Sequence, residues 1–110
     1  MNSLQSAANL CHCYQDSHLT VDFQLKTVEL DGQLLELTQK EFDLLALLVR
    51  RAGELIPRPI LLMLVWGYGV ENQTRTLDVH IRRLRKNLGS YATQYIETVF
   101  GVGYRFQPSN

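Results

Sequence analysis

The sequence predicts a single α+β domain in which a small antiparallel sheet precedes three helices and a β-hairpin closes the fold. Three observations support this class. Apolar and polar residues alternate near the start, helical periodicity with capping signals fills the middle, and two glycines separate short β-type segments near the end. The length of 110 residues and the hydrophobic fraction of 45% are typical of one ordinary globular domain.

The first residues of the chain carry no signal of secondary structure. Residues 1–8 are small and polar without periodicity, which is typical of a linker end or an added tail. We therefore expect the folded domain to occupy residues 9–110.

The sheet is predicted from β-type segments that precede the first helix. Asp31 and Gly32 both tolerate a positive φ, so they predict a tight hairpin turn. Strands are expected at 19–23, 27–30 and 33–37, with a further edge strand over 9–14, which gives a sheet of three or four strands.

The first helix begins at a capping box. The Thr38 hydroxyl can accept from the Glu41 amide while the Glu41 carboxylate reaches back, and the helix is expected to run to about Arg51 before Gly53. Its apolar residues cover most of its circumference, so this helix is predicted to be the buried centre. They are Phe42, Leu44, Leu45, Ala46, Leu47, Leu48 and Val49.

Two more helices and a hairpin are expected after a short extended piece at Leu55-Ile56. The second helix runs over about 58–65, where Pro59 in the first turn costs little because its missing amide donor has no partner there. The third helix, about 74–88, begins at Thr74 as N-cap and stops at Gly89. The closing hairpin, about 95–106, pairs 95–98 with 104–106 across Gly101 and Gly103.

Basic and acidic side chains balance over the whole chain but not along it. The chain has 11 of each and a formal net charge of zero. Residues 1–70 hold five basic and eight acidic side chains, a balance of −3, whereas residues 71–110 hold six basic and three acidic ones, a balance of +3. This asymmetry is expected of a nucleic-acid binder, although a solvated helix face is the plainer interpretation of most charge runs.

Helical geometry gives the third helix two different faces. The apolar face carries Leu77, Ile81, Leu84 and Leu88, and the opposite face carries Arg75, Val79, Arg82, Arg83 and Lys86, flanked by Thr76, His80 and Arg85. Asp78 is the only acid and is placed to brace Arg82 one turn on. A merely solvated helix usually mixes charges of both signs, so the basic face predicts a negatively charged partner.

The arginines suit double-stranded DNA. A guanidinium can bond a guanine edge at two points or clamp a phosphate, an α-helix fits the major groove, and Val79 can touch a thymine methyl. A helix, a short loop, a second helix with a basic outer face and a hairpin together describe a winged helix-turn-helix. Its hairpin wing would lie along the neighbouring minor groove or backbone.

Four segments, in order and suitably spaced, resemble the DNA-binding effector domain of OmpR/PhoB-type response regulators. The resemblance covers about residues 19–106. The segments are Leu37-Thr38-x-x-Glu41-Phe42-x-Leu44-Leu45, Val65-Trp66-Gly67, Arg75-Thr76-Leu77-Asp78-Val79-His80-Ile81-Arg82-Arg83-Leu84-Arg85-Lys86 and Gly101-Val102-Gly103-Tyr104-Arg105-Phe106.

The resemblance implies roles at matched positions. Base contacts are expected from Val79, Arg82 and Arg83, and backbone contacts from Trp66, Arg75, Thr76, His80, Arg85, Lys86, Thr98 and Tyr104. For Trp66 a core aromatic position is an alternative that can hold as well. For His80 a solvated surface position is an equal alternative.

The sequence departs from the family at three places. Phe100 stands where the wing tip often has arginine, which weighs against a charged wing in the minor groove. A protein contact or simple packing is at least as good an interpretation of Phe100. Pro57 replaces the usual Ser or Thr cap of the second helix. Ile60, Met63 and Leu64 stand where that helix is usually partly polar, and they form either an apolar partner patch or a contact with the N-terminal sheet or linker.

In this family, the second helix and the loop over 68–73 are associated with contact to RNA polymerase. Ile60, Met63, Tyr68 and Glu71 are therefore the expected protein-partner surface. The resemblance also implies a receiver domain, which we do not expect within these 110 residues, and a partner histidine kinase. Two copies are expected in tandem on DNA, whereas the isolated domain is expected to be a monomer.

Other functions are less favoured. No nucleophile, base and orienting group occur at interpretable spacing, so we expect no enzyme. Cys11 and Cys13 flank His12, too close for an unstrained disulfide, and His18 and His80 complete no ligand set, so we expect no metal and no cofactor. The longest apolar run has seven residues, 60–66, against the roughly 18 of a membrane span, and we expect a cytoplasmic protein.

Two rivals stay open. A one-component or membrane-anchored regulator could carry the same DNA-binding domain, and the rest of the gene product would distinguish it. A winged helix can also serve as a protein-interaction module, but such a module needs no cluster of Arg82, Arg83 and Lys86 on one helix face.

Overall fold

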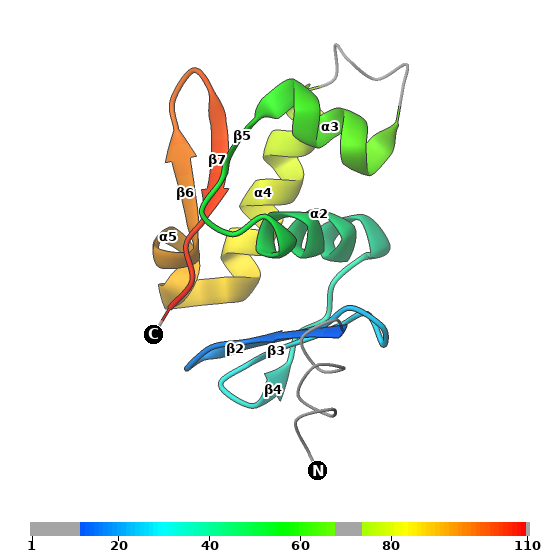
Figure 1. The fold of residues 1–110 in the computed structure, drawn as a ribbon, viewed down its shortest axis with the longest axis vertical. Helices are drawn as coiled ribbons and strands as arrows, with labels where there is room; N and C mark the ends of the chain where they lie inside the picture. The colour runs from blue at the N-terminus through cyan, green and yellow to red at the C-terminus, as the bar shows by residue number, and fades with distance from the viewer. Residues whose placement is uncertain (1–11, 68–73, 110) are drawn as a thin grey trace.

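The computed structural model describes residues 12–67 and 74–109. An N-terminal sheet lies beneath a group of helices, and a second sheet stands beside them (Figure 1). The predicted α+β winged-helix class is confirmed.

The N-terminal sheet has four antiparallel strands in the order β1-β2-β3-β4. They are β1 (Cys13–Gln15), β2 (Leu19–Asp22), β3 (Thr27–Leu30) and β4 (Gln33–Leu34). Asp31 and Gly32 have φ values of 51° and 82° between the paired Leu30 and Gln33, so the predicted turn is confirmed. The returning strand is shorter than expected: β4 ends at Leu34, and after one further bond from the Leu35 amide to the Val28 carbonyl, over 2.8 Å, the chain turns toward the first helix.

Helix α2 (Gln39–Arg50) follows the predicted capping box. The Glu41 amide donates to Thr38 Oγ1 over 3.2 Å, and the Thr38 amide donates to the Glu41 carboxylate over 3.0 Å. Leu44, Leu45 and Leu48 are fully buried, which confirms that this helix is the centre of the domain. The cap stabilises the helix start by about 1 kcal/mol.

Helices α3 (Arg58–Trp66) and α4 (Thr74–Leu88) lie close to their predicted bounds. The sequence did not reveal the 3-10 turn η1 (Gly89–Tyr91) and the short helix α5 (Ala92–Tyr95), since so short a segment shows no periodicity. Tyr95 was expected in a strand but ends α5, where its buried ring stacks on Phe106 with centroids 5.5 Å apart.

The second sheet has three strands, not the two of the predicted hairpin. Strand β5 (Leu55–Pro57) joins the hairpin of β6 (Ile96–Val99) and β7 (Gly103–Phe106) in the order β5-β7-β6. A Cβ at Gly103 would lie 2.0 Å from the Ile56 carbonyl oxygen, so only glycine allows β5 to pair there. The strands β6 and β7, drawn in orange and red in Figure 1, form the wing.

Asp16 joins the N-terminal sheet to the end of the chain. It accepts hydrogen bonds from the hydroxyls of Tyr14 and Tyr95 and from the Ser109 amide. Burial alone would raise the pKa of Asp16, but the hydrogen bonds, including those from the amides of the turn after it, outweigh burial and lower it to about 2. Asp16 is therefore a charged acceptor that connects segments far apart in sequence.

Candidate nucleic-acid interface

Helix α4 has one buried and one exposed face. Leu77, Ile81, Leu84 and Leu88 are buried in the core. The side chains of Arg75, Arg82, Arg83 and Lys86 are exposed, and Val79 among them is half-buried. The predicted division is confirmed, and we call these five residues the basic face.

The basic face lies between two neighbouring structures. On one side Asp78 and Arg85 contact the wing, and on the other side His80 contacts Trp66 at the end of α3. Residues four apart lie about 40° apart around a helix, and residues three apart about 60°. Arg82 therefore lies on the wing side of the basic face, since it follows Asp78 by four positions and precedes Arg85 by three.

Asp78 connects three elements. Its carboxylate pairs with Arg58 at the start of α3 and accepts a hydrogen bond of 2.8 Å from the Tyr104 hydroxyl in β7. Burial alone would raise the pKa of Asp78, but the hydrogen bonds from Arg58 and Tyr104 outweigh it and lower the pKa. The expectation that Asp78 braces Arg82 was wrong, because the Asp78 carboxylate is bonded to Arg58 and Tyr104 instead.

Arg85 fastens the other end of α4 to the wing. Its Nη2 donates to the Ile96 carbonyl over 2.8 Å and to the Thr98 hydroxyl, and its guanidinium lies 5.6 Å from the centre of the Tyr104 ring. Tyr104 is only 7% exposed. Three expected phosphate contacts, Arg85, Thr98 and Tyr104, are thus brought together by bonds inside the domain.

Trp66 and His80 lie together on the far side of the basic face. Their rings meet edge to face with centroids 4.8 Å apart, and both side chains are half-buried. The His80 Nδ1 lies 2.8 Å from the Thr76 carbonyl oxygen, one turn earlier in α4. Trp66 also packs against the core, so its core position is confirmed, and part of its surface remains exposed.

The exposed side of α3 is apolar. Ile60 is 38% exposed and Leu64 is 46% exposed one turn later, with Met63 half-buried beside them. Ile60 and Leu64 are therefore not covered by the N-terminal sheet, whereas the alternative of a contact with the linker falls on residues 1–11, outside the described residues. We call these three residues the α3 strip. Tyr68 and Glu71, also expected on this surface, lie outside the described residues.

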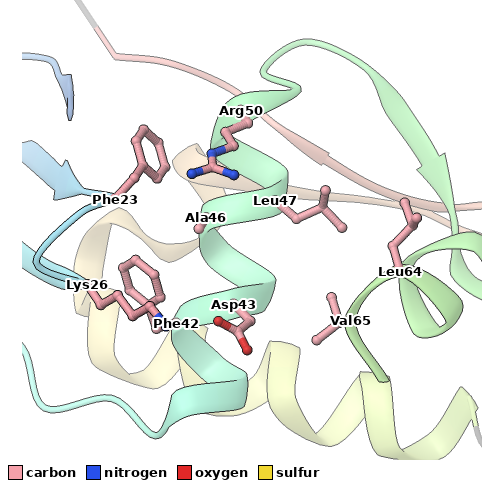
Figure 2. A pocket seen from close by; sticks show the side chains of 9 residues that line it. All are labelled: Phe23, Lys26, Phe42, Asp43, Ala46, Leu47, Arg50, Leu64 and Val65. Atoms are coloured by element: carbon pink, nitrogen blue, oxygen red, sulfur yellow. The ribbon is translucent and has the colours of Figure 1, made fainter. Parts of the chain in front are cut away.

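A hollow of about 300 Å³ borders the α3 strip (Figure 2). It opens between the turn after β2, the outer side of α2 and the end of α3, and Leu64 lines one wall. The Arg50 guanidinium lies 4.5 Å from the centre of the Phe23 ring at the opposite wall. The sequence did not predict this hollow, because its walls come from segments that no local pattern connects.

The wing tip carries no charge. Phe100 is 90% exposed and Val102 is 41% exposed, on either side of Gly101. Simple packing of Phe100 was one expected alternative, and the exposed ring excludes it. Arg58, which the sequence analysis missed as a site residue, lies close to this tip, since its amide donates to the Val102 carbonyl over 3.0 Å.

Membrane spans and metal sites were sought within residues 12–67 and 74–109. In those ranges no helix is both long and apolar enough to span a bilayer. The same ranges contain no group of three His, Cys, Asp or Glu side chains placed to hold a metal ion. Cys13 is a half-buried free thiol, and burial together with the charge of Asp22 raises its pKa, whereas Cys11 lies outside the described residues.

Several known proteins are similar to this chain. The sequence family described as "Transcriptional regulatory protein, C terminal" matches residues 32–106. The transcriptional regulatory protein YclJ of Bacillus subtilis is 47% identical over 79% of this chain and 39% of its own length. The regulator HprR of Escherichia coli is 42% identical over 82% of this chain and 41% of its own length. The chain thus spans about two fifths of these relatives.

Solved structures have the same fold. The response regulator DrrB of Thermotoga maritima, an OmpR/PhoB homologue, has a TM-score of 0.80 at 32% identity, over 94% of this chain and 50% of that one. The Klebsiella pneumoniae RstA DNA-binding domain, solved in complex with the RstA box, has a TM-score of 0.79 at 33% identity, over 88% of this chain and 98% of that one. Fold and family match agree: the chain belongs to the C-terminal winged-helix effector domains of OmpR/PhoB-type transcriptional regulatory proteins.

Proposed function

We propose that residues 9–110 form a domain that binds double-stranded DNA sequence-specifically, as the output domain of a two-component transcriptional regulator. Residues 1–8 are a linker or tail in this proposal. The observation that carries it is the basic face, which places four cations on one side of a helix whose other side is buried. The RstA domain bound to the RstA box supports it, because that relative shares the fold.

Helix α4 enters the major groove in this proposal. Arg82, Arg83 and Val79 contact base edges, since they lie centrally on the basic face. Arg75 and Lys86 contact phosphates from either end. Further contacts with the DNA backbone come from the exposed parts of six side chains that are also bonded or packed within the domain. They are Trp66, Thr76, His80, Arg85, Thr98 and Tyr104.

Selection of bound duplexes from random DNA, followed by titration at several salt concentrations, tests the proposal. Replacing both Arg82 and Arg83 with alanine should weaken binding to the selected duplex by about a hundredfold, as expected for two base contacts. The control is Arg51→Ala, which removes an exposed cation at the end of α2. Equal affinity of the double variant and the unmodified chain would overturn the assignment of α4.

We propose that the partners beyond DNA follow the family pattern. A receiver domain controlled by a histidine kinase belongs to the full-length protein, which acts in the cytoplasm. The isolated domain is a monomer that binds tandem half-sites as two copies. Sedimentation of the free chain, and titration of duplexes with one or two half-sites, tests this. A stable dimer without DNA would contradict it.

We propose that the α3 strip borders the surface that contacts RNA polymerase, together with Tyr68 and Glu71. Its support is the exposed Ile60 and Leu64, because a helix with no such partner gains nothing from apolar side chains in water. Ile60→Glu combined with Met63→Glu should lower transcription from a target promoter while DNA affinity stays unchanged. Unchanged transcription from the folded variant would exclude this surface.

A further inference from the structure

We propose that Phe100 is a specificity determinant, an apolar wedge that the wing presses into the minor groove at a deformable base step beside the site that α4 reads. This inference rests on the proposed DNA binding. An apolar wedge differs from a charged wing tip, because Phe100 cannot attract a phosphate. Its binding energy depends instead on how easily a base step unstacks.

The first support is that the backbone on both sides of Phe100 is fixed and presents its ring to solvent. The Val102 amide donates to the Val99 carbonyl over 3.0 Å, and the Arg58 amide fixes the Val102 carbonyl over the same distance. Gly101 has a φ of 79°, which lets the chain reverse directly after Phe100. The backbone of the turn is thus fixed at both ends and carries a ring that is 90% exposed, so the chain at Phe100 needs no reordering before the ring can enter a groove.

The second support is the place of the wing relative to the basic face. Arg85 holds strand β6 at Ile96 and Thr98, and Asp78 holds strand β7 at Tyr104. Both anchors lie on the flank of α4 next to Arg82. A duplex whose major groove receives Arg82 therefore has its adjoining backbone and minor groove on the side of the wing.

The third support is the chemistry of the tip. The residues from Val99 to Val102 are all uncharged, and Phe100 and Val102 are both exposed. Apolar side chains that enter the minor groove partly unstack a base step and bend the duplex. Pyrimidine–purine steps such as TA and CA unstack most easily, so a phenylalanine wedge favours them without any hydrogen bond to a base.

These observations favour DNA over a second protein as the partner of the wing tip. The strands that carry the tip are bonded to α4 through Arg85 and Asp78, on the flank of α4 next to Arg82. The exposed apolar residues that would suit a protein partner, Ile60 and Leu64, lie on α3. Contact between the wing tip and another copy of the chain is the competing outcome of the test.

The test compares Phe100→Ala with the unmodified chain in two assays. Titration of a selected duplex with one half-site should show about a tenfold loss of affinity, the effect of losing one stacked aromatic contact. The dependence of affinity on salt should stay unchanged, because no phosphate contact is lost. The matched control is Leu25→Ala, which removes another exposed apolar side chain from the turn after β2.

The second assay repeats the selection from random DNA with each variant. Duplexes selected by the unmodified chain should be enriched in TA or CA steps at one fixed distance from the bases read by α4, and Phe100→Ala should lose this enrichment. Phe100→Leu should keep part of it, since leucine is also an apolar wedge.

The outcomes separate this inference from the proposed function. If the unmodified chain selects no sequence, DNA binding itself fails. If selection depends on Arg82 and Arg83 but Phe100→Ala has the same one-site affinity and step preference, only the wedge is refuted. A loss seen on two-site duplexes alone would also overturn the wedge, in favour of a contact between copies.

Discussion

Two aspartates hold this domain together in the same chemical way at different places. Asp16 accepts bonds from Tyr14, Tyr95 and Ser109 and ties the N-terminal sheet to the chain end. Asp78 accepts bonds from Arg58 and Tyr104 and ties the wing and α3 to α4. Only Asp78 lies beside the basic face. We therefore expect Asp16 to stabilise the fold and Asp78 to position the DNA-binding elements.

The largest expected effect on stability is at Asp16. Replacing it with alanine leaves two tyrosine hydroxyls and several amides without their acceptor, and should lower the free energy of unfolding by about 3 kcal/mol. Urea denaturation measures this change. DNA affinity, measured under conditions in which the variant is still folded, should stay within twofold of the unmodified chain. A large loss of affinity would mean that Asp16, like Asp78, positions the DNA-binding elements.

At Asp78 we expect a small loss of stability and a large loss of DNA affinity, the reverse of Asp16. Asp78→Ala should cost about 1 kcal/mol of stability, because the pair with Arg58 is partly exposed to water. It should also weaken DNA binding by about tenfold, because the wing is no longer held against α4. Asp78→Asn, which keeps an acceptor for Tyr104, should lose less affinity. Unchanged affinity in Asp78→Ala would assign it a purely structural role.

Acid titration measures how much the charge of Asp16 contributes to stability without removing the side chain. The pKa of Asp16 is lowered from 3.8 to about 2, so its contribution is fully present above pH 4 and is lost as the pH falls toward 2. The unfolding free energy should fall by about 2 kcal/mol across that window. Asp16→Asn should flatten this part of the curve, and an unchanged curve would contradict the assignment.

The smallest expected effect is at Arg75, which belongs to neither aspartate cluster. Arg75→Ala should weaken binding to all DNA sequences about equally and lower the slope of log affinity against log salt by about one unit. Stability should be unaffected because the side chain is exposed. A changed sequence preference would instead make Arg75 a base contact.

The parts of the fold that depend on neighbouring residues could be predicted from the sequence. The capping box of Thr38 and Glu41, the Asp31-Gly32 turn and the bounds of α4 each follow from a local pattern. The pairing of Ile56 with Tyr104 could not be predicted, because no periodicity connects segments so far apart.

The same limit applied to the site. The exposed and buried faces of α4 followed from helical geometry, whereas the partners of its flanking residues did not. Asp78 has an attractive neighbour at Arg82 in sequence, but the fold brings Arg58 and Tyr104 to it instead. Arg85 was expected at a phosphate and also proves to be a structural anchor of the wing.

In the proposed complex, Arg82 and Arg83 would read guanine edges in the major groove. Methylation interference on a selected duplex tests it, because a methyl group on guanine N7 blocks the acceptor that an arginine uses. Methylation at one or two guanines should abolish binding by the unmodified chain, and the chain with both arginines replaced by alanine should bind weakly but equally with or without the methyl groups. Binding by the unmodified chain that is insensitive to methylation at every guanine would show that Arg82 and Arg83 do not read guanine in the major groove.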